Sequence, residues 1–416
     1  MARAPKANAV VGQSGGPTGT INASLAGVVE EVCKHGEIGN LYGAVHAVQG
    51  IIKENFVDLK NLSVAVLEGI ASCPSSALGS SRDKPDREYC ERIFNVFKKR
   101  DVRYFFYIGG NDSANTAHII NVMAAEVGYE MRAFHIPKTI DNDLLVTDHC
   151  PGYGTAARFV ACALMGDDLD NRALPGIKID VVMGRNAGFL AAASVLGKQR
   201  DDDSPHLVYF PERALSIDKF LSDVEVVYKK LGRCVAVVSE GVCDTDGMTW
   251  AEKISKGTLT THVAQQGADV HEKDAHGNIQ LSGTGALADF LASQVKARFG
   301  AKRVRADTFG YLQRSFVGLQ SPVDVDEARR CGREAVKFSM TEQSGSVALK
   351  RTGDGDDYGV ELICTELRNV AEKTKSMPPE FINSDGNGVT DAFIRYASPL
   401  TGELPKTHYL GGYPKV

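Results

Sequence analysis

The stretch VRYFFYIGGNDSANTAHII, residues 102–120, joins an apolar segment to a helical pattern through two glycines. Its first nine residues, 102–110, are typical of a buried strand. We expect Ser113 to cap the helix that follows. A glycine turn that opens a helix favours an anion, because free backbone N–H groups and the helix dipole point at it. The stretch therefore predicts a phosphate site, and Asp112 places an unexpected negative charge in it. The expected helix has one apolar stripe, formed by Ala117, Ile120, Ala124 and Val127.

The rest of the chain repeats this alternation of apolar runs and helical patterns. Strands alternating with helices indicate an α/β fold with parallel sheets, which bind ligands at the carboxyl ends of their strands. The polar stretch 350–360 is predicted to be a loop or a hairpin turn, 375–389 a boundary, and 398–416 mostly irregular. Further strands are expected at 8–12, 131–137, 177–184, 206–211 and 233–241, and further helices from Thr20 and over 155–170 and 216–230.

Composition narrows the class of protein. The chain has 416 residues, a net charge of −5 and 43% hydrophobic residues, which is typical of a soluble protein and argues against nucleic-acid or membrane-surface binding. No apolar run reaches the length of a membrane span, and the N-terminus has no signal-peptide core. The nine cysteines are scattered and form no CxxC pair, so we expect reduced thiols in the cytoplasm and no zinc site.

A second glycine turn, VGQSGGPTGTINAS at 11–24, follows the first expected strand. Gly15 and Gly16 either form a plain strand-to-helix turn or bring backbone N–H groups close to a phosphate. Two such turns on one sheet favour a shared anion site. Neither turn reads G-x-G-x-x-G, which argues against a dinucleotide-binding dehydrogenase.

Charged residues stand at the ends of several further strands. IPKTIDNDL, residues 136–144, supplies Lys138, which could neutralise phosphate charge, and Asp141, which could act as a general base. Arg185 follows another strand, and its planar guanidinium suits a phosphoryl group. A single charged loop is more often solvated than catalytic, but charges at successive strand ends favour one site. The other candidate residues for this site are the charged Glu240, Arg305 and Arg314 and the polar Tyr311.

The segments GGNDS, PKTIDND, MGRNAG, SEG and GYLQR resemble the phosphofructokinase family in order and spacing over residues 8–340, and its pyrophosphate-dependent branch most closely. The resemblance implies two Rossmann-like three-layer lobes with mostly parallel sheets and an active site in the cleft between them. It also implies phosphoryl transfer from pyrophosphate to the 1-hydroxyl of fructose 6-phosphate. We expect a pyrophosphate and Mg²⁺ lobe from residues 1–150 with about 315–375, a sugar-phosphate lobe from 151–314, and a C-terminal extension, 376–416.

The resemblance also implies roles for individual residues. Asp141 takes the proton from the sugar, and Arg185 contacts the transferring phosphoryl group. Arg305 reaches the site from a neighbouring subunit, which implies a homodimer or homotetramer with shared sites. Pyrophosphate meets Gly15, Gly16 and Arg82. The sugar and its 6-phosphate meet Thr139, Ile140, Met183, Gly184, Glu240, Tyr311, Leu312, Gln313 and Arg314.

The resemblance offers an explanation for the negative charge of Asp112. ATP-using relatives carry glycine there, which leaves room for the α-phosphate, whereas a carboxylate would repel it by several kcal/mol at an effective dielectric near 20. Lys138, which ATP-using relatives usually lack, stabilises the leaving phosphate. The alternative is that Asp112 only caps the helix. Asn111 stands where the branch commonly has a magnesium-site aspartate, so Mg²⁺ would be held mainly by pyrophosphate oxygens and waters, helped by Asp141 or Asp143.

Two alternatives share the same chemistry or fold. An ATP-dependent phosphofructokinase is opposed by Asp112 and Lys138. A non-catalytic sugar-phosphate sensor should have lost its base or its arginines, yet Asp141, Arg185 and Arg314 are present. The insertion 242–284 has no assigned role, and its His262, His271 and His276 lack convincing metal spacing, so we expect them to be solvated.

Overall fold

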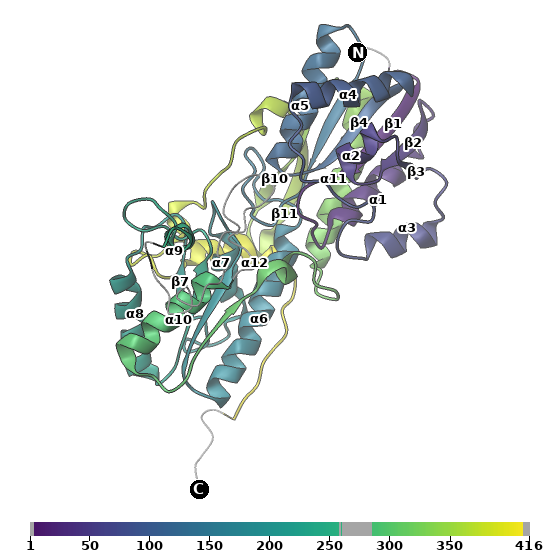
Figure 1. Ribbon diagram of the computed structural model, residues 1–416. Helices are drawn as coiled ribbons and strands as arrows, with labels where there is room; N and C mark the ends of the chain where they lie inside the picture. Colours follow the sequence, from purple (N-terminus) through teal and green to yellow (C-terminus); the bar gives the residue numbers. More distant parts are fainter. Residues whose placement is uncertain (1–3, 258, 260–284, 411–416) are drawn as a thin grey trace.

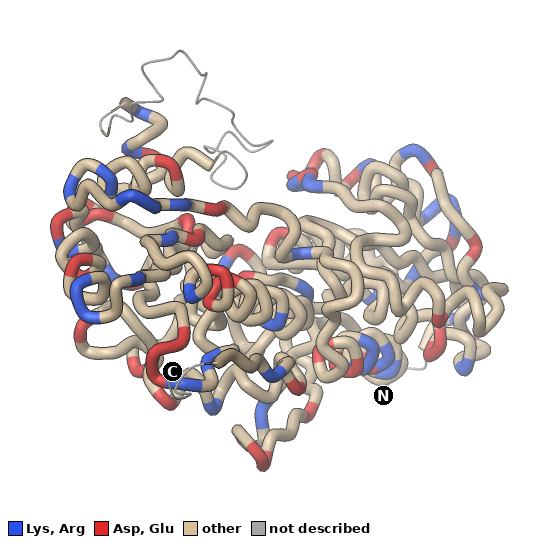
Figure 2. Tube along the Cα trace, turned by 90° about the horizontal axis from the view of Figure 1, so that it is seen from below, with Lys and Arg blue, Asp and Glu red and all other residues tan. Residues whose placement is uncertain are grey.

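The computed structural model describes residues 4–257, 259 and 285–410, so His262, His271 and His276 lie outside the described residues. Two sheets form the centres of two lobes, which lie side by side (Figure 1). Among the described residues, no helix combines the length and apolar character that crossing a bilayer requires. Lys, Arg, Asp and Glu are interspersed along both lobes (Figure 2).

The first lobe is built on a seven-stranded sheet in the order β11-β10-β5-β4-β1-β2-β3. Its five inner strands are parallel, while the edge strands β3 and β11 are antiparallel to their neighbours. The predicted hairpin at 350–360 is the β10–β11 connection. The strands are β1 (Ala7–Gln13), β2 (Ile38–Ala44), β3 (Phe56–Asp58), β4 (Val102–Gly109), β5 (Arg132–Pro137), β10 (Gly345–Gly353) and β11 (Gly359–Thr365).

Helices cover both faces of this sheet. On one face α1 and α11 pack closely, which two glycines allow. A Cβ on Gly27 would lie 2.0 Å from the Arg329 carbonyl oxygen, and one on Gly332 would lie 2.1 Å from that of Ser24. A separate apolar cluster joins the other face to α2, α4 and α5. The helices are α1 (Ile21–Val32), α2 (Ala47–Ile52), α3 (Val64–Ala71), α4 (Arg87–Lys99), α5 (Asn111–Glu126) and α11 (Pro322–Thr341).

The second lobe has a four-stranded parallel sheet in the order β7-β8-β6-β9, again with apolar clusters on both faces. The predicted α/β fold with two three-layer lobes is therefore confirmed, and each of the six predicted strands is present. The elements are α6 (Tyr153–Ala173), β6 (Ile177–Val182), α7 (Phe189–Ala193), β7 (Leu207–Tyr209), α8 (Ile217–Leu231), β8 (Cys234–Ser239), α9 (Trp250–Ser255), α10 (Ala286–Phe299) and β9 (Val304–Thr308).

One local prediction was wrong. Ser113 is not the cap of α5: the helix begins at Asn111, and Gly110 is its N-cap, because the Gly110 carbonyl accepts the N–H groups of Ser113 and Ala114. The described part of 398–416 is mostly irregular, as predicted, but a helix that was not predicted begins before it. Residues 391–401 form α12 (Asp391–Thr401), which buries Phe393 and three other side chains against the second lobe and lies where the lobes meet (Figure 1).

A buried charge cluster links β6 to its neighbours. Lys178 contacts Asp167 of α6, and its Nζ lies 2.9 Å from Asp307 of β9 and 3.9 Å from Asp180. The Asp180 side chain is completely buried, and burial raises its pKa well above its ordinary value, with a further rise from Asp167. Because the pKa of Asp180 is higher in the folded chain than in the unfolded chain, the stability that Asp180 contributes is lost as the pH rises above the carboxyl range of the unfolded chain.

We predict that Asp180→Asn will stabilise the protein progressively more as the pH rises from 5 to 8. The neutral amide needs no proton, whereas folding of the wild type loses up to about 1.4 kcal/mol per pH unit in this range. Thermal unfolding at a series of pH values measures the difference in Tm. Asp326→Asn is the control, because its side chain is 63% exposed. A Tm difference that does not change with pH would show that Asp180 is ionised in the folded protein.

Candidate active site

The glycine turn that follows β1 stands against Lys138, which comes directly after β5. Gly15 has a positive φ of +76°, and its N–H donates to the Ser81 carbonyl at 2.9 Å. Nζ of Lys138 donates to the Gly16 carbonyl at 2.7 Å, and a Cβ on Gly15 would lie 3.2 Å from the same nitrogen. A larger residue at Gly15 would therefore be strained and would crowd Lys138.

Three cations gather beside this turn. A Cβ on Gly16 would lie 2.7 Å from Nη1 of Arg314, so this guanidinium lies directly on the turn. Burial, together with the positive charges of Arg314 and Arg82, lowers the pKa of Lys138 to about 7. Burial and Arg82 likewise lower the pKa of Arg314. This concentration of positive charge favours a multiply charged anion, which would restore the charge of Lys138.

Two carboxylates follow Lys138 in the same loop. The Thr139 hydroxyl accepts the Asp141 N–H at 3.1 Å and donates to Asp143 at 3.5 Å. Burial raises the pKa of Asp141, and Glu240 raises it further, while Lys138 and two arginines act in the opposite direction. Burial also raises the pKa of Asp143, as does the charge of Asp141. Both carboxyls therefore bind protons more readily than ordinary aspartates, which suits a general base.

The C-terminal segment holds this loop in place. Asn142 stands between the two aspartates at a φ of +59°, and its amide donates to the Tyr396 hydroxyl of α12 at 2.7 Å. The side-chain carbonyl of Asn142 accepts the Cys150 N–H at 2.9 Å. The Lys375 N–H donates to the Asp143 carbonyl at 2.7 Å. This loop, residues 138–143, is the candidate catalytic loop. Its conformation therefore depends on residues more than 200 positions away.

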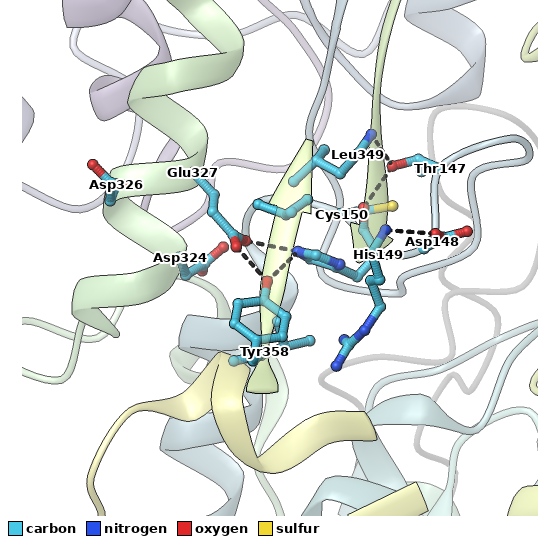
Figure 3. A network of polar contacts seen from close by, with 12 residues as sticks. Thr147, Asp148, His149, Cys150, Asp324, Asp326, Glu327, Leu349 and Tyr358 are labelled. Carbon is cyan, nitrogen blue, oxygen red and sulfur yellow. Dashed lines mark hydrogen bonds and ion pairs between the residues drawn. The ribbon is translucent and has the colours of Figure 1, made fainter. Parts of the chain in front are cut away.

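The chain after the loop is anchored to the first lobe (Figure 3). His149 lies between Glu327 of α11 and Tyr358, with its Nε2 2.6 Å from the Glu327 carboxylate. The Tyr358 hydroxyl contacts the same carboxylate and lies 3.2 Å from His149. The Thr147 hydroxyl accepts the Leu349 N–H at 3.0 Å. Both ends of the loop are thus tied to rigid elements.

The second lobe brings its own polar residues to this loop. Gly184 has a φ of +139°, and its carbonyl accepts the Ser239 hydroxyl at 2.6 Å. Gln313 accepts the Met183 N–H at 3.2 Å. A Cβ on Gly241 would lie only 2.1 Å from the Arg185 carbonyl oxygen, so these two strand-end loops are in direct contact. The charges of Arg185 and Glu240 both act on Asp141.

A carboxylate and a cluster of cations thus meet where the two lobes face each other. Asp141 provides the carboxylate, and the cations beside Gly15 and Gly16 provide the charge. Phosphoryl transfer needs such charge placement around an in-line displacement more than it needs covalent chemistry.

Comparison with known proteins agrees with this arrangement. Residues 8–339 match the family described as Phosphofructokinase. The chain belongs to the phosphofructokinase family. The predicted relationship to the pyrophosphate-dependent branch of this family is also confirmed. The chain is 52% identical, over 97% of each chain, to the pyrophosphate–fructose 6-phosphate 1-phosphotransferase of Rhodospirillum rubrum. It is 37% identical, over 98% of this chain and 95% of the relative, to the protein of that name from Halomonas elongata.

Solved structures give the same result. The crystal structure of a pyrophosphate-dependent phosphofructokinase from Nitrosospira multiformis matches with a TM-score of 0.83 and 33% identity, over 98% of this chain and 95% of that one. The described lobes therefore have the arrangement found in solved members of the phosphofructokinase family.

The structure brings most of the predicted site residues together, although their roles stay predictions. Leu312 is 62% exposed. Arg305 lies on β9 at the edge of its sheet and donates to the Val304 carbonyl at 3.0 Å. The residues brought together are Gly15, Gly16, Arg82, Lys138, Thr139, Asp141, Met183, Gly184, Arg185, Glu240, Tyr311, Gln313 and Arg314, with Ile140 buried against Met183.

Asn111 and Asp112 form the first turn of α5. Asp112 is not the helix cap, because Gly110 holds that position. Its carboxylate is 52% exposed and pairs with Lys84 at 3.0 Å. The Asn111 side-chain oxygen accepts the Asp112 N–H at 2.9 Å. The reading of Asp112 as a cap is therefore wrong.

Several residues of the site were not found from the sequence. Lys84 could have been noticed beside Arg82, and Asn142 as an asparagine in a tight charged loop, where left-handed backbone is common. Lys375 and Tyr396 carry no local signal, because their contacts depend on how the chain folds back.

We predict that Gly241→Ala will lower the free energy of unfolding by about 1–3 kcal/mol, as overpacking does. The added Cβ displaces the Arg185 carbonyl, so turnover with pyrophosphate and fructose 6-phosphate should fall as well. Urea unfolding and steady-state kinetics measure the two effects. Gly166→Ala is the matched control, because nothing lies within 4 Å of the added Cβ. Unchanged stability and turnover in Gly241→Ala would show that the two loops do not touch.

Proposed function

We propose that this protein transfers a phosphoryl group from pyrophosphate to the 1-hydroxyl of fructose 6-phosphate. The products are fructose 1,6-bisphosphate and phosphate, and the reaction is reversible and serves glycolysis or gluconeogenesis. The observation that carries the proposal is the partly buried carboxylate of Asp141 beside the Lys138 and Arg314 cluster on the Gly15–Gly16 turn. The name of the Rhodospirillum rubrum relative supports it.

The reaction assigns a task to each charge. Asp141 accepts the proton of the sugar 1-hydroxyl as its oxygen attacks the nearer phosphorus of pyrophosphate. The bond from that phosphorus to the bridging oxygen breaks, and the electrons stay on the departing phosphate. Lys138 and Arg82 meet the charge of this phosphate, while Arg185 meets the transferring group. Asp141 then returns the proton to solvent.

The sugar occupies the side of the site that the second lobe provides. Glu240 lies at the end of β8 and would accept hydrogen bonds from sugar hydroxyls. Arg314 would meet the 6-phosphate, and its guanidinium carbon lies 4.4 Å from the Tyr311 ring centre, which holds it in place. Thr139, Ile140, Met183, Gly184, Leu312 and Gln313 complete the predicted sugar side.

The phosphoryl donor depends on Asp112. Its carboxylate stands in the first turn of α5, where relatives that use ATP need room for a second phosphate. Both partners of its ion pair with Lys84 are more than half exposed, so this pair is weak and the carboxylate stays available to repel an anion. Pyrophosphate is shorter than ATP and ends before this point.

Mg²⁺ fits the loop as a partner of the substrate. It commonly takes one or two carboxylates and completes its shell with phosphate oxygens and water. Asp141 and Asp143 provide a partly buried carboxylate pair, and Asn111 is a weaker candidate because its side-chain oxygen already accepts a hydrogen bond. Asp167, Asp180 and Asp307 are close enough to hold an ion, but Lys178 already pairs with Asp167 and Asp307. When bound, Mg²⁺ would offset phosphate charge.

We also infer a homodimer or homotetramer with sites at the subunit interface. Arg305 lies on an edge strand, and large apolar side chains are exposed just after it, with Phe316 41% and Val317 76% exposed. An exposed apolar group of this kind is typical of an interface. All nine cysteines are free thiols, which supports a cytoplasmic protein.

We predict product from pyrophosphate and not from ATP. The protein is mixed with fructose 6-phosphate, Mg²⁺ and either donor, and fructose 1,6-bisphosphate is measured. Equal or greater activity with ATP would assign the chain to the ATP-dependent chemistry. No activity with either donor would favour a sugar-phosphate sensor.

Asp112→Gly sharpens this test of the donor. We expect ATP-dependent product to become measurable and pyrophosphate use to fall, because the repulsion is removed. Lys84→Gln is the matched control, since it breaks the same ion pair but keeps the carboxylate, and it should not admit ATP. If Asp112→Gly binds ATP no better than the wild type in direct titration, the carboxylate does not select the donor.

Asp141→Asn should lower turnover by at least about 100-fold, in line with the loss of a general base, while fructose 6-phosphate binding is largely retained. In the wild type, kcat/KM should rise as the pH passes about 6, where Asp141 loses its proton, and fall above about 7, where Lys138 does. Rate measurements between pH 5 and 9 give both limbs. Near-normal turnover of Asp141→Asn would contradict its assignment as the base.

A further inference from the structure

A cavity of about 490 Å³ lies behind the catalytic loop, between elements of both lobes. β10 of the first lobe and α7 of the second contribute to its wall, and so does α12. Its volume falls in the range of small-molecule sites. Lys138, Asp141 and Arg314 are not among the residues that line it, so it is separate from the active site.

We propose that this cavity is a second binding site, which takes a small organic anion with a flat apolar group, such as an aryl phosphate. The existence of the site does not depend on the proposed reaction. Only its effect on turnover rests on the proposed function.

The polar wall carries more positive than negative charge. Lys350, Arg351 and Lys375 line the cavity together with two carboxylates, Asp148 and Asp354. Lys350 pairs with Asp148 at 3.0 Å. Nζ of Lys375 donates to the carbonyls of Thr147 at 2.7 Å and Asp148 at 3.0 Å. Within the described part of the chain, it pairs with no carboxylate. Burial lowers the pKa of Lys375, which an anion beside it would reverse.

Arg351 supplies the strongest sign of a missing partner. Its side chain is only 9% exposed, and its Nε donates to Asp354 at 2.7 Å. Nη2 lies 2.6 Å from the same oxygen, but neither terminal nitrogen makes a hydrogen bond of acceptable geometry to any described residue. Buried guanidinium groups normally have all of their donors engaged. An anion that enters the cavity would provide the acceptor after a small rotation of this side chain.

The opposite wall is aromatic. Phe189, Phe381 and Tyr396 line it, and the Phe381 and Tyr396 ring centres are 5.1 Å apart. The guanidinium carbon of Arg351 lies 4.6 Å from the Tyr396 ring, so charge and apolar surface adjoin. A ligand with a flat apolar body and one anionic group matches both walls.

The cavity is also connected to catalysis. Tyr396 lines it and, through its hydroxyl, holds Asn142 of the catalytic loop. Lys375 lines it and holds the Asp143 carbonyl. A ligand that moves either residue changes the position of Asp141. If such a ligand changes the affinity of the site for substrate by some factor, substrate must change the affinity for the ligand by the same factor.

Calorimetric titration of the full chain with phenyl phosphate, without substrates, tests the site. We expect binding that survives Arg314→Ala, which removes an active-site cation, and that weakens about tenfold in Arg351→Gln. Because Arg351 is buried and its variant could unfold, Phe381→Ala provides a second test. It should weaken phenyl phosphate binding and leave inorganic phosphate binding unchanged. The proposal would be overturned if phenyl phosphate does not bind at millimolar concentration, or if both cavity variants bind it as tightly as the wild type. Loss of binding in Arg314→Ala would overturn it as well.

The connection to catalysis has its own test. Phenyl phosphate should change kcat for the wild type. It should change kcat less for Tyr396→Phe, which keeps the ring and binds the probe but loses the hydrogen bond to Asn142. An identical response in Tyr396→Phe would exclude this route. Because the calorimetric result does not use turnover, it stands or falls independently of the proposed reaction.

Discussion

Lys138 is buried and Asp141 is partly buried just after β5, and neither charge could be held there alone. Removing an isolated ammonium or carboxylate from water costs several kcal/mol even after the protein relaxes. Here Asp141 favours the charged form of Lys138, and Lys138 favours the charged form of Asp141. The surrounding cations and Glu240 shift this balance further, so both groups titrate near neutral pH. The same electrostatic balance that permits burial also prepares the loop for an anion.

This balance explains much of the surrounding construction. The glycines at positions 15 and 16 leave room for Lys138 and Arg314, which side chains would fill. Gly241 allows the loop of Arg185 to approach. Asn142 accepts a left-handed backbone between the two aspartates of the loop. Each feature positions a charge, which is what phosphoryl transfer requires of a protein.

The fold was largely predictable, because its strands are short apolar runs and its helices have clear apolar stripes. β1 and β4 to β8 were all expected. The start of α5 was misplaced at Ser113, since a serine before an apolar stripe is a common cap and the sequence does not reveal that Gly110 already closes the turn. α12 was missed because Pro399 and the glycine-rich stretch before it are typical of irregular chain.

The site was predictable where its residues lie in continuous motifs, as Lys138 and Asp141 do. It was not predictable where contacts join distant parts of the chain. The Lys84–Asp112 pair needs α5 and the loop before α4 to be placed side by side. The hydrogen bond from Asn142 to Tyr396 spans 254 positions and leaves no pattern in either segment.

That last contact has a consequence for synthesis on the ribosome. The chain is made from its N-terminus, so residues 138–143 emerge long before Tyr396 and Lys375, which hold them. Domains generally fold as they emerge. The first lobe also lacks β10 and β11 at that stage, although they complete its sheet next to β5. A nascent chain that stops short of α12 would therefore carry every motif residue of the active site without the contacts that fix its loop. Competence for the reaction would be acquired only after α12 has been made.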